Sequence, residues 1–247
     1  MFTRLLIGLD GSPQADEALE QAVVLGQRFG ATLVVAHVRE PGATDGDGAM
    51  LERARERAAA AALKIETIEK DGDPALALAE LAKDVDAVLV GRRGHTRGKE
   101  AIGATVATLI RVSERCVVVS GVPSPMRVCA VAFDGGETSR RALDLAARFA
   151  TVVGSTVHVI HANADHAAGV QVVGQAEAAL SLLGVPFVTH VEPGKPGEVV
   201  AAVVRQTRCD ALFAGAHVPR HGERPSAVVS HSEEILRHTD IPVVIQP

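Results

Sequence analysis

The sequence contains no tryptophan and no tyrosine, and its six phenylalanines make up only 2% of 247 residues. Hydrophobic residues of all kinds nevertheless account for 47% of the chain, which is enough for a buried core. Because large rings are nearly missing, this core must be built from alanine, valine, leucine and isoleucine. The length suits one large domain or two small ones.

An excess of basic charge is also missing. Lysine and arginine total 25 against 30 acidic residues, so the formal net charge at pH 7 is −5, and both halves of the chain are slightly acidic. Proteins that bind nucleic acid neutralise its phosphates with clustered basic side chains. The charge balance therefore predicts that nucleic acid is not a partner.

Long apolar runs and paired cysteines are absent as well. No apolar run reaches the roughly 20 residues that span a membrane, and the opening "MFTRLLIGLD" is typical of a strand rather than a signal peptide. We therefore expect no membrane contact. Cys116, Cys129 and Cys209 form neither a Cys-x-x-Cys motif nor a disulfide framework, which predicts a reducing, cytoplasmic location.

The chain repeats itself. Residues 4–38 and 127–162 share one plan, in which an apolar run ends at Asp-Gly, an amphipathic stretch and a glycine follow, and a second apolar run ends in histidine. The matched pairs, each 124 positions apart, are Asp10 and Asp134, His37 and His161, and Gly91 and Gly215. We predict two homologous domains, 1–122 and 127–247, joined by a linker at 123–126.

The apolar periodicity alternates between strand and helix within each copy. In the first copy the predicted strands span 4–9, 32–38, 64–70, 86–90 and 116–120, and the predicted helices span 13–29, 48–63, 74–83 and 103–112. This alternation predicts a parallel sheet with helices on both faces. Such sheets bind ligands beyond the carboxyl ends of their strands. Asp10, His37 and Gly91 all lie at the carboxyl ends of predicted strands and mark one candidate pocket.

The stretch "VGRRGHTRGKEAIGAT" (90–105) allows two interpretations. Glycines before a helix let backbone N–H groups approach an anion, and the basic side chains could neutralise a polyphosphate. The basic residues of this stretch are Arg92, Arg93, Arg97 and Lys99. Alternatively, a turn from strand to helix needs glycine anyway, and loop arginines are simply solvated. The stretch is neither a Walker A loop nor a Rossmann fingerprint.

Three segments resemble the universal stress protein family: "LLIGLDGS", "GDPALALAELAKDVDAVLVGRRG" and the G-x2-G…G run. The resemblance extends over nearly the whole chain, twice, so the chain looks like a tandem member. It implies two five-stranded parallel α/β domains of the adenine nucleotide alpha hydrolase-like kind. It also implies a stress-response module, a sensor or regulator, that binds ATP or AMP with or without Mg²⁺.

The resemblance also implies a set of nucleotide-binding residues. By position, Asp10 matches the family's ribose-binding aspartate, Gly8 and Leu9 lie near the adenine, and Val38 matches the residue packed on its ring. By pattern alone, Asp10 is equally typical of a turn and Val38 of a core residue. The complete implied set is Gly8, Leu9, Asp10, Val38, Val90, Gly91, Arg93, Gly94, Gly103, Ala104 and Thr105.

The sequence departs from the family's G-x2-G-x9-G-(Ser/Thr) pattern. Only eight residues separate Gly94 from Gly103, and Ala104 occupies the hydroxyl position, with Thr105 next to it. In the second copy Val218 and Val229 replace two of the glycines. A β-branched residue rarely adopts the backbone conformations open to glycine. We therefore predict nucleotide binding in the first domain and none in the degenerate second domain.

Metal and catalytic sites are not expected. Eight of the ten histidines lie in the second half, but no metal-binding spacing exists, and we interpret them as solvent-exposed loop residues. His37 ends a strand and is interpreted as a hydrogen-bonded structural histidine. Without a nucleophile motif, the chain is at most a slow ATPase.

The alternative function is assembly through protein contacts without nucleotide. In that reading the strands at 116–120 and 241–246 pair the two domains as an intramolecular pseudo-dimer, which can associate further into a homodimer.

Overall fold

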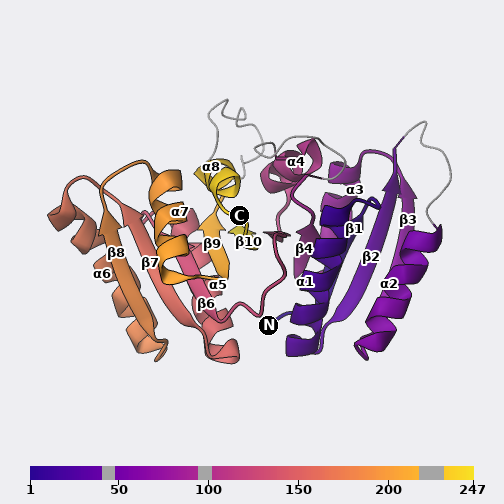
Figure 1. The fold of residues 1–247 in the computed structure, drawn as a ribbon, viewed down its shortest axis with the longest axis horizontal. Coiled ribbons are helices and arrows are strands. Elements are labelled where there is room, and N and C mark those ends of the chain that lie inside the picture. The colour runs from indigo at the N-terminus through magenta and orange to yellow at the C-terminus, as the bar shows by residue number, and fades with distance from the viewer. Residues whose placement is uncertain (41–47, 94–101, 217–230) are drawn as a thin grey trace. The chain divides into compact units, whose positions relative to one another are not determined.

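The computed structural model describes residues 1–40, 48–93, 102–216 and 231–247 (Figure 1). The chain divides into two compact units, Met1–Pro123 and Ser124–Pro247, which we call the first and second domains. Gly94, Arg97, Lys99, Val218 and Val229 lie outside the described residues.

The first domain is a five-stranded parallel sheet in the order β3-β2-β1-β4-β5. Its elements are β1 (Arg4–Leu9), α1 (Pro13–Phe29), β2 (Thr32–Arg39), α2 (Gly48–Ala60), β3 (Ile65–Asp71), α3 (Pro74–Leu81), a 3-10 turn (Ala82–Asp84), β4 (Ala87–Val90), α4 (Ala104–Val112) and β5 (Cys116–Val119). Right-handed crossovers place α1 and α2 on one face of such a sheet and α3 and α4 on the other. The predicted fold is confirmed.

The second domain repeats this arrangement in the order β8-β7-β6-β9-β10, again with all strands parallel. Its elements are β6 (Val128–Ala132), α5 (Glu137–Val153), β7 (Thr156–Ala162), α6 (His166–Leu182), β8 (Phe187–Glu192), α7 (Pro196–Thr207), β9 (Ala211–Gly215), α8 (His231–His238) and β10 (Val243–Gln246). As in the first domain, the third and fourth helices, α7 and α8, contact each other.

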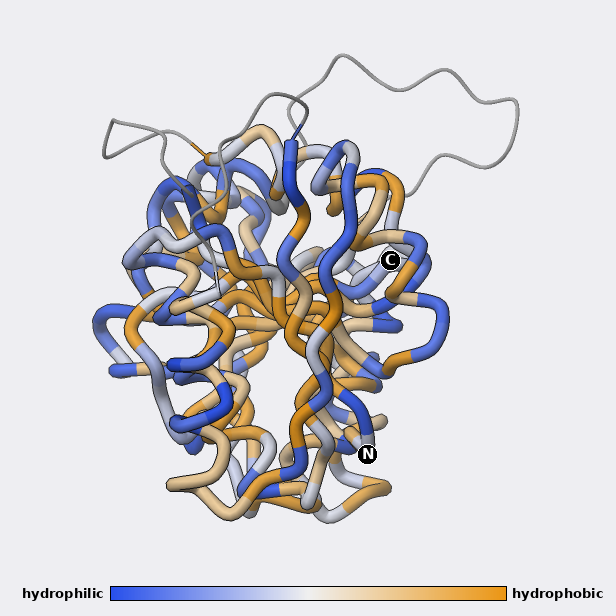
Figure 2. The backbone as a smooth tube through the Cα atoms, turned by 90° about the vertical axis from the view of Figure 1, so that its right-hand side faces the viewer, coloured by the Kyte–Doolittle hydropathy of each residue, from blue (hydrophilic) through white to orange (hydrophobic). Residues whose placement is uncertain are grey.

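The core of the first domain lies along β1, β2, β4 and β5. All residues of β4 and β5 are buried, whereas the edge strand β3 alternates between half-buried and exposed positions. Figure 2 shows the hydrophobic stretches along the central strands and the hydrophilic ones mainly on helices and turns. Aliphatic side chains supply most of the core in both domains, as predicted, although in the second domain Phe149 and Phe213 also pack together, with ring centroids 5.7 Å apart.

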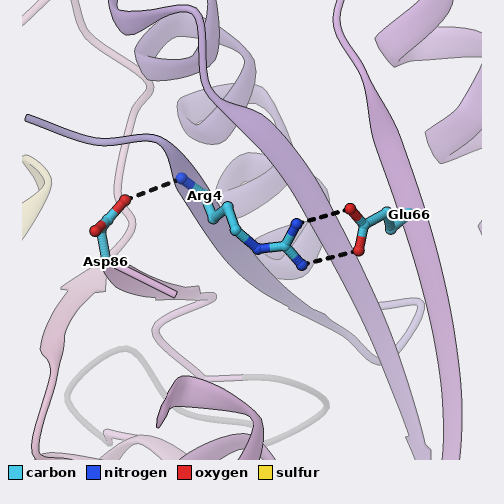
Figure 3. A network of polar contacts seen from close by, with 3 residues as sticks. All are labelled: Arg4, Glu66 and Asp86. Carbon is cyan, nitrogen blue, oxygen red and sulfur yellow. Dashed lines mark hydrogen bonds and ion pairs between the residues drawn. The ribbon is translucent and has the colours of Figure 1, made fainter. Parts of the chain in front are cut away.

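An aspartate anchors the beginning of the first strand (Figure 3). The Oδ2 atom of Asp86 accepts hydrogen bonds from the backbone amides of Thr3 (2.6 Å) and Arg4 (2.9 Å) and from the Thr3 hydroxyl (2.8 Å). Burial by itself raises the pKa of Asp86, but these hydrogen bonds outweigh it, so that the pKa lies below its usual value. Arg4 in turn donates two hydrogen bonds, of 2.7 and 2.8 Å, to the Glu66 carboxylate on β3.

The second domain keeps this aspartate. Asp210 accepts hydrogen bonds from the amides of Arg127 (3.1 Å) and Val128 (2.8 Å) at the start of β6. Asp210 follows Asp86 by 124 positions, so the repeat seen in the sequence extends to individual hydrogen bonds.

Candidate functional site

A cavity of ≈ 750 Å³ lies in the first domain, at the carboxyl ends of β1, β2 and β4 and beside the start of α4. Every predicted site residue that the structure describes lines it. These residues are Gly8, Leu9, Asp10, Val38, Val90, Gly91, Arg93, Gly103, Ala104 and Thr105. The sheet therefore gathers residues that are up to almost a hundred positions apart in the sequence around one space.

Asp10 takes part in a turn and also lines the cavity. Its Oδ1 atom accepts a hydrogen bond of 2.9 Å from the amide of Ser12. Ser12 in turn begins α1 and caps it, because its hydroxyl accepts a hydrogen bond from the amide of Ala15. The side chain of Asp10 is exposed at the cavity. Both interpretations of Asp10, as a turn residue and as a pocket residue, are thus compatible with its position.

Gly91 is required by packing. A Cβ atom at this position would lie 2.6 Å from the carbonyl carbon of Gln14, in the first turn of α1. Gly215 is in the same situation, since its Cβ would lie 2.4 Å from the carbonyl carbon of Thr138 in α5. Close approach of the helix to the strand end explains why this glycine persists in both domains. Its presence alone is therefore weak evidence for a phosphate site.

The two ends of the glycine loop meet at its base. The amide of Gly103 donates a hydrogen bond of 3.0 Å to the carbonyl of Arg92. A Cβ at Gly103 would lie only 3.2 Å from the backbone of Arg93, which favours glycine here as well. Helix α4 begins immediately afterwards, so that Ala104 and Thr105 bring its N-terminal turn to the cavity. N–H groups in a first helical turn lack intrahelical partners and attract anions.

The two described arginines of the loop differ in their surroundings. Arg93 lines the cavity, whereas Arg92 is only 5% exposed. Of the two arginines, Arg93 is therefore the one whose positive charge lies at the cavity.

Sequence reasoning missed several residues of the cavity wall. Pro74 and Leu78 come from α3, and their spacing of four places them on one face of the helix. That face of α3 approaches β1 closely, because a Cβ at Gly8 would lie 2.9 Å from Leu78 Cδ1. The remaining wall residues that were not predicted are Ser12, Ala15, Ala36, Arg39, Glu40 and Val106, whereas His37 lines the cavity as the strand ends suggested. Helical periodicity could have identified the apolar face of α3, but not the strand that it contacts.

His37 has the structural hydrogen bond that the sequence suggested. Its Nδ1 atom lies 2.9 Å from the carbonyl oxygen of Leu9, and because a carbonyl only accepts, Nδ1 carries the proton. His161 forms the same bond, of 2.8 Å, to the carbonyl of Phe133. In each domain this histidine therefore ties the end of the second strand to the end of the first.

The interpretation of the second-half histidines as exposed loop residues is wrong for three of them. His161 lies on β7 and is only 8% exposed. His158 and His190 lie on β7 and β8 and are half-buried, with their rings in contact. Sheet pairing between β7 and β8 brings these two rings together, and the spacing in the sequence gives no sign of it. His217 and His221 lie outside the described residues.

The aspartate of the second domain has a hydroxyl as a hydrogen-bond partner. Asp134 Oδ1 accepts hydrogen bonds from the Gly136 amide (2.8 Å) and from the Ser139 hydroxyl (2.6 Å). The position in the first domain that corresponds to Ser139 is Ala15, which has no hydroxyl to donate. The aspartates at the ends of the two first strands therefore have different local partners.

The described residues contain neither a group of three metal ligands nor a membrane-spanning helix. In those ranges no three histidine, cysteine or acidic side chains are grouped as a metal centre. Among the helices of the same ranges, none is long and apolar enough to cross a membrane.

Comparisons with known proteins agree with the fold and its repeat. The model of the universal stress protein family matches residues 1–121 and again 126–247. Universal stress protein YxiE of Bacillus subtilis is 30% identical over 145 residues, which are 48% of this chain and 98% of YxiE. Universal stress protein Slr1230 of Synechocystis is 25% identical over 187 residues, which are 73% of this chain but only 64% of Slr1230.

Solved structures show the same architecture over the whole length. A universal stress protein from Archaeoglobus fulgidus superposes with a TM-score of 0.82 at 21% identity, covering 98% of this chain and 97% of that one. A functionally unknown protein from Pseudomonas aeruginosa, PA1789, superposes with a TM-score of 0.72 at 14% identity, covering 99% and 92%. At these identities the likeness is one of fold.

Proposed function

This chain belongs to the universal stress protein family, with one family domain in each half, and from this premise we propose that its first domain binds an adenine nucleotide. The protein then acts as a stress-response sensor or regulator whose state depends on the bound nucleotide. The observation that carries the proposal is the convergence of every described residue of the implied set on one cavity.

The cavity offers different chemistry at its two ends. Leu9, Val38 and Leu78 supply apolar surface on which a purine ring can pack. The carboxylate of Asp10 is suited to accept hydrogen bonds from ribose hydroxyls. At the other end, the first turn of α4 and Arg93 are suited to phosphate oxygens. The volume of ≈ 750 Å³ falls within the range of small-molecule sites, about 300–1,000 Å³.

We propose binding in the first domain alone. In the second domain the Ser139 hydroxyl and the Gly136 amide both donate to Asp134 Oδ1, so part of the accepting capacity of this carboxylate is already used. The valines that replace glycine in this copy add to the argument from the sequence. The proposal therefore predicts one adenine nucleotide per chain, ATP or AMP, with or without Mg²⁺.

Calorimetric titration of the intact chain with ATP, ADP and AMP tests this proposal. Asp10→Asn keeps an oxygen that can accept from the Ser12 amide but removes the charge offered to the ribose. Losing hydrogen bonds to a charged group should cost about 1.5–3 kcal/mol, or roughly 10- to 150-fold in affinity. The matched control is Asp134→Asn in the second domain, which should leave the affinity unchanged.

Three results would contradict parts of the proposal. Two nucleotides per chain would show that the second domain binds after all. Equal losses in both variants would remove Asp10 from its assigned role. No binding at millimolar nucleotide would favour the alternative, a tandem module that acts only through protein contacts.

A further inference from the structure

Two histidines of the second domain face each other across neighbouring strands. His158 lies on β7 and His190 on β8, and His158 Nδ1 is 2.9 Å from His190 Nε2. The rings are inclined by only 18°, with centroids 5.2 Å apart. Both side chains are half-buried, and Val188, the residue of β8 that pairs with His158, is 44% exposed. Solvent therefore reaches this part of the sheet.

The fold does not require imidazoles at these positions. By the offset of 124, His158 corresponds to Val34 of the first domain. His190 corresponds to Ile68, because the two residues pair with equivalent positions of the neighbouring strand, Ile160 and Ala36. The first domain thus builds the same place in its sheet from Val34 and Ile68. Two aliphatic side chains are sufficient for packing at these positions. Packing alone therefore does not explain why the second domain has two histidines there.

Both rings are suited to act as ligands at neutral pH. Burial and the neighbouring ring lower the pKa of His158, and burial lowers the pKa of His190, partly opposed by Glu192 on the same strand. The neutral ring is the form that binds metals, and the hydrogen bond between the two rings requires that one of the facing nitrogens offers a lone pair. Imidazole suits zinc, copper and nickel.

The 2.9 Å between the two nitrogens is an ordinary hydrogen-bond length, and it is also short enough for both nitrogens to reach one ion. With metal–nitrogen bonds of about 2.0–2.1 Å, two nitrogens in adjacent right-angled positions lie about 2.9 Å apart, whereas a tetrahedral ion holds them about 3.3 Å apart. Right-angled nitrogen and oxygen coordination is typical of Cu²⁺ and Ni²⁺. We propose that His158 and His190 form a two-imidazole site for Cu²⁺ or Ni²⁺ that bridges β7 and β8.

Binding exchanges the hydrogen bond between the rings for two metal bonds. Of the two facing nitrogens, one carries a proton and donates the hydrogen bond, and the other accepts the hydrogen bond with its lone pair. On binding, the donor ring takes its other tautomer, so that its proton moves to the far ring nitrogen and no net proton is released. Small rotations of the rings then direct both lone pairs at one ion, and water completes its coordination. This site does not depend on nucleotide binding in the first domain.

The test is a titration of the intact, tag-free chain with Cu²⁺ and with Ni²⁺, followed by calorimetry and, for Cu²⁺, by electron paramagnetic resonance. The informative variant is His158→Val with His190→Ile, because the first domain already uses these residues. It should bind one ion fewer than the wild type and lose the resonance pattern of two nitrogens. Each single variant, His158→Gln or His190→Gln, should weaken this site by at least about tenfold.

His166→Gln is the matched control, since His166 is an exposed histidine at the start of α6. It should keep the wild-type stoichiometry and spectrum. Circular dichroism establishes that each variant is folded, and if the double variant is not, the two single variants decide. An unchanged stoichiometry in the folded double variant, or full affinity in either single variant, would overturn the proposal.

Discussion

Gly91 and Gly215 are glycines at which an added Cβ would collide with backbone atoms of a helix in the same domain. Each lies at the end of a buried strand and touches the backbone of the helix that follows the first strand of its domain. Backbone atoms cannot move aside as a flexible side chain can. A Cβ at Gly8 would instead meet side chains, with Leu78 Cδ1 at 2.9 Å as the nearest atom, and a leucine side chain can rotate.

Gly91→Ala and Gly215→Ala should therefore each destabilise the protein, by about 1–3 kcal/mol as for other overpacked sites. Urea unfolding of both variants measures the loss. Gly174→Ala is the control, because Gly174 lies inside α6 with open space around it, and alanine there should stabilise by up to about 1 kcal/mol. Wild-type stability in Gly91→Ala would mean that α1 can shift, and the packing explanation of this glycine would then be wrong.

The Asp86 carboxylate should make the stability of the protein depend on pH. Its folded pKa lies below the unfolded value, so the carboxylate contributes stability above that unfolded value, near 3.8. This contribution is lost as the pH falls through the folded pKa. Asp86→Asn should lower the free energy of unfolding by about 2 kcal/mol at pH 7 and by much less near pH 2.

Glu66→Gln is the matched control for Asp86→Asn, since both carboxylates interact with Arg4 but Glu66 is half-exposed (Figure 3). An exposed ion pair contributes only about 0–1 kcal/mol. Denaturant unfolding of both variants between pH 2 and 7 measures the difference. Equal losses in the two variants at pH 7 would show that the hydrogen bonds to the strand start carry no special weight.

At the scale of elements, ends of helices differ from the sequence prediction more than their centres do. The predicted helix 48–63 ends at Ala60, because Ala62 adopts a left-handed φ of 56° without the glycine that usually marks such an end. The predicted helix 74–83 ends at Leu81 and continues as a 3-10 turn. Neither difference moves a residue of the cavity.

The junction between the glycine loop and α4 should set which phosphates are recognised. In the proposed site, the shortened loop and Ala104 should weaken contacts to the far phosphate, while contacts to the adenosine at Leu9 and Asp10 should be unaffected. We therefore expect ATP to have little advantage over ADP or AMP. One residue inserted within 97–102, combined with Ala104→Ser, should raise ATP affinity more than AMP affinity, by roughly tenfold for a recovered hydrogen bond.

Parallel titrations of the wild type and the repaired variant with ATP and AMP give the comparison. Thr105→Ala serves as the second arm, because Thr105 also lines the cavity and carries a hydroxyl. Tight ATP binding by the wild type, together with no gain on repair and a loss in Thr105→Ala, would show that Thr105 already fills the role.

At the scale of the whole molecule, two domains with one ancestral plan are proposed to differ in function. The first keeps the cavity residues, and the second uses Ser139 to hold the matching aspartate and carries the histidine pair. How the two domains pair, whether chains associate further and whether the protein is cytoplasmic stay predictions.

Hydrogen exchange of the intact chain with saturating ATP or AMP should reveal this division. A ligand that binds only the folded first domain, at a hundred times its dissociation constant, stabilises that domain by about 2.7 kcal/mol. Slower exchange is expected in the strands of residues 1–123, with no direct protection around Asp134. Protection centred on the β6–α5 turn would show that the nucleotide binds the second domain, which would contradict the proposal.

The sequence by itself determined the class of fold, the two copies and the strand ends at which to look for a site. These features are local, because strand and helix periods and a fixed offset of 124 can be counted along the chain. The set of family positions that the resemblance implied, from Gly8 to Thr105, also surrounds one cavity wherever the structure describes its members.

Only the tertiary structure decided which of these residues serve packing and which remote residues meet. It showed that α1 requires glycine at position 91, that Leu78 of α3 completes the cavity, and that His158 meets His190 across 32 positions. Each contact depends on the register of neighbouring strands or on the approach of a helix to the sheet. Those distances arise when the whole domain packs, and no local pattern in the chain encodes them.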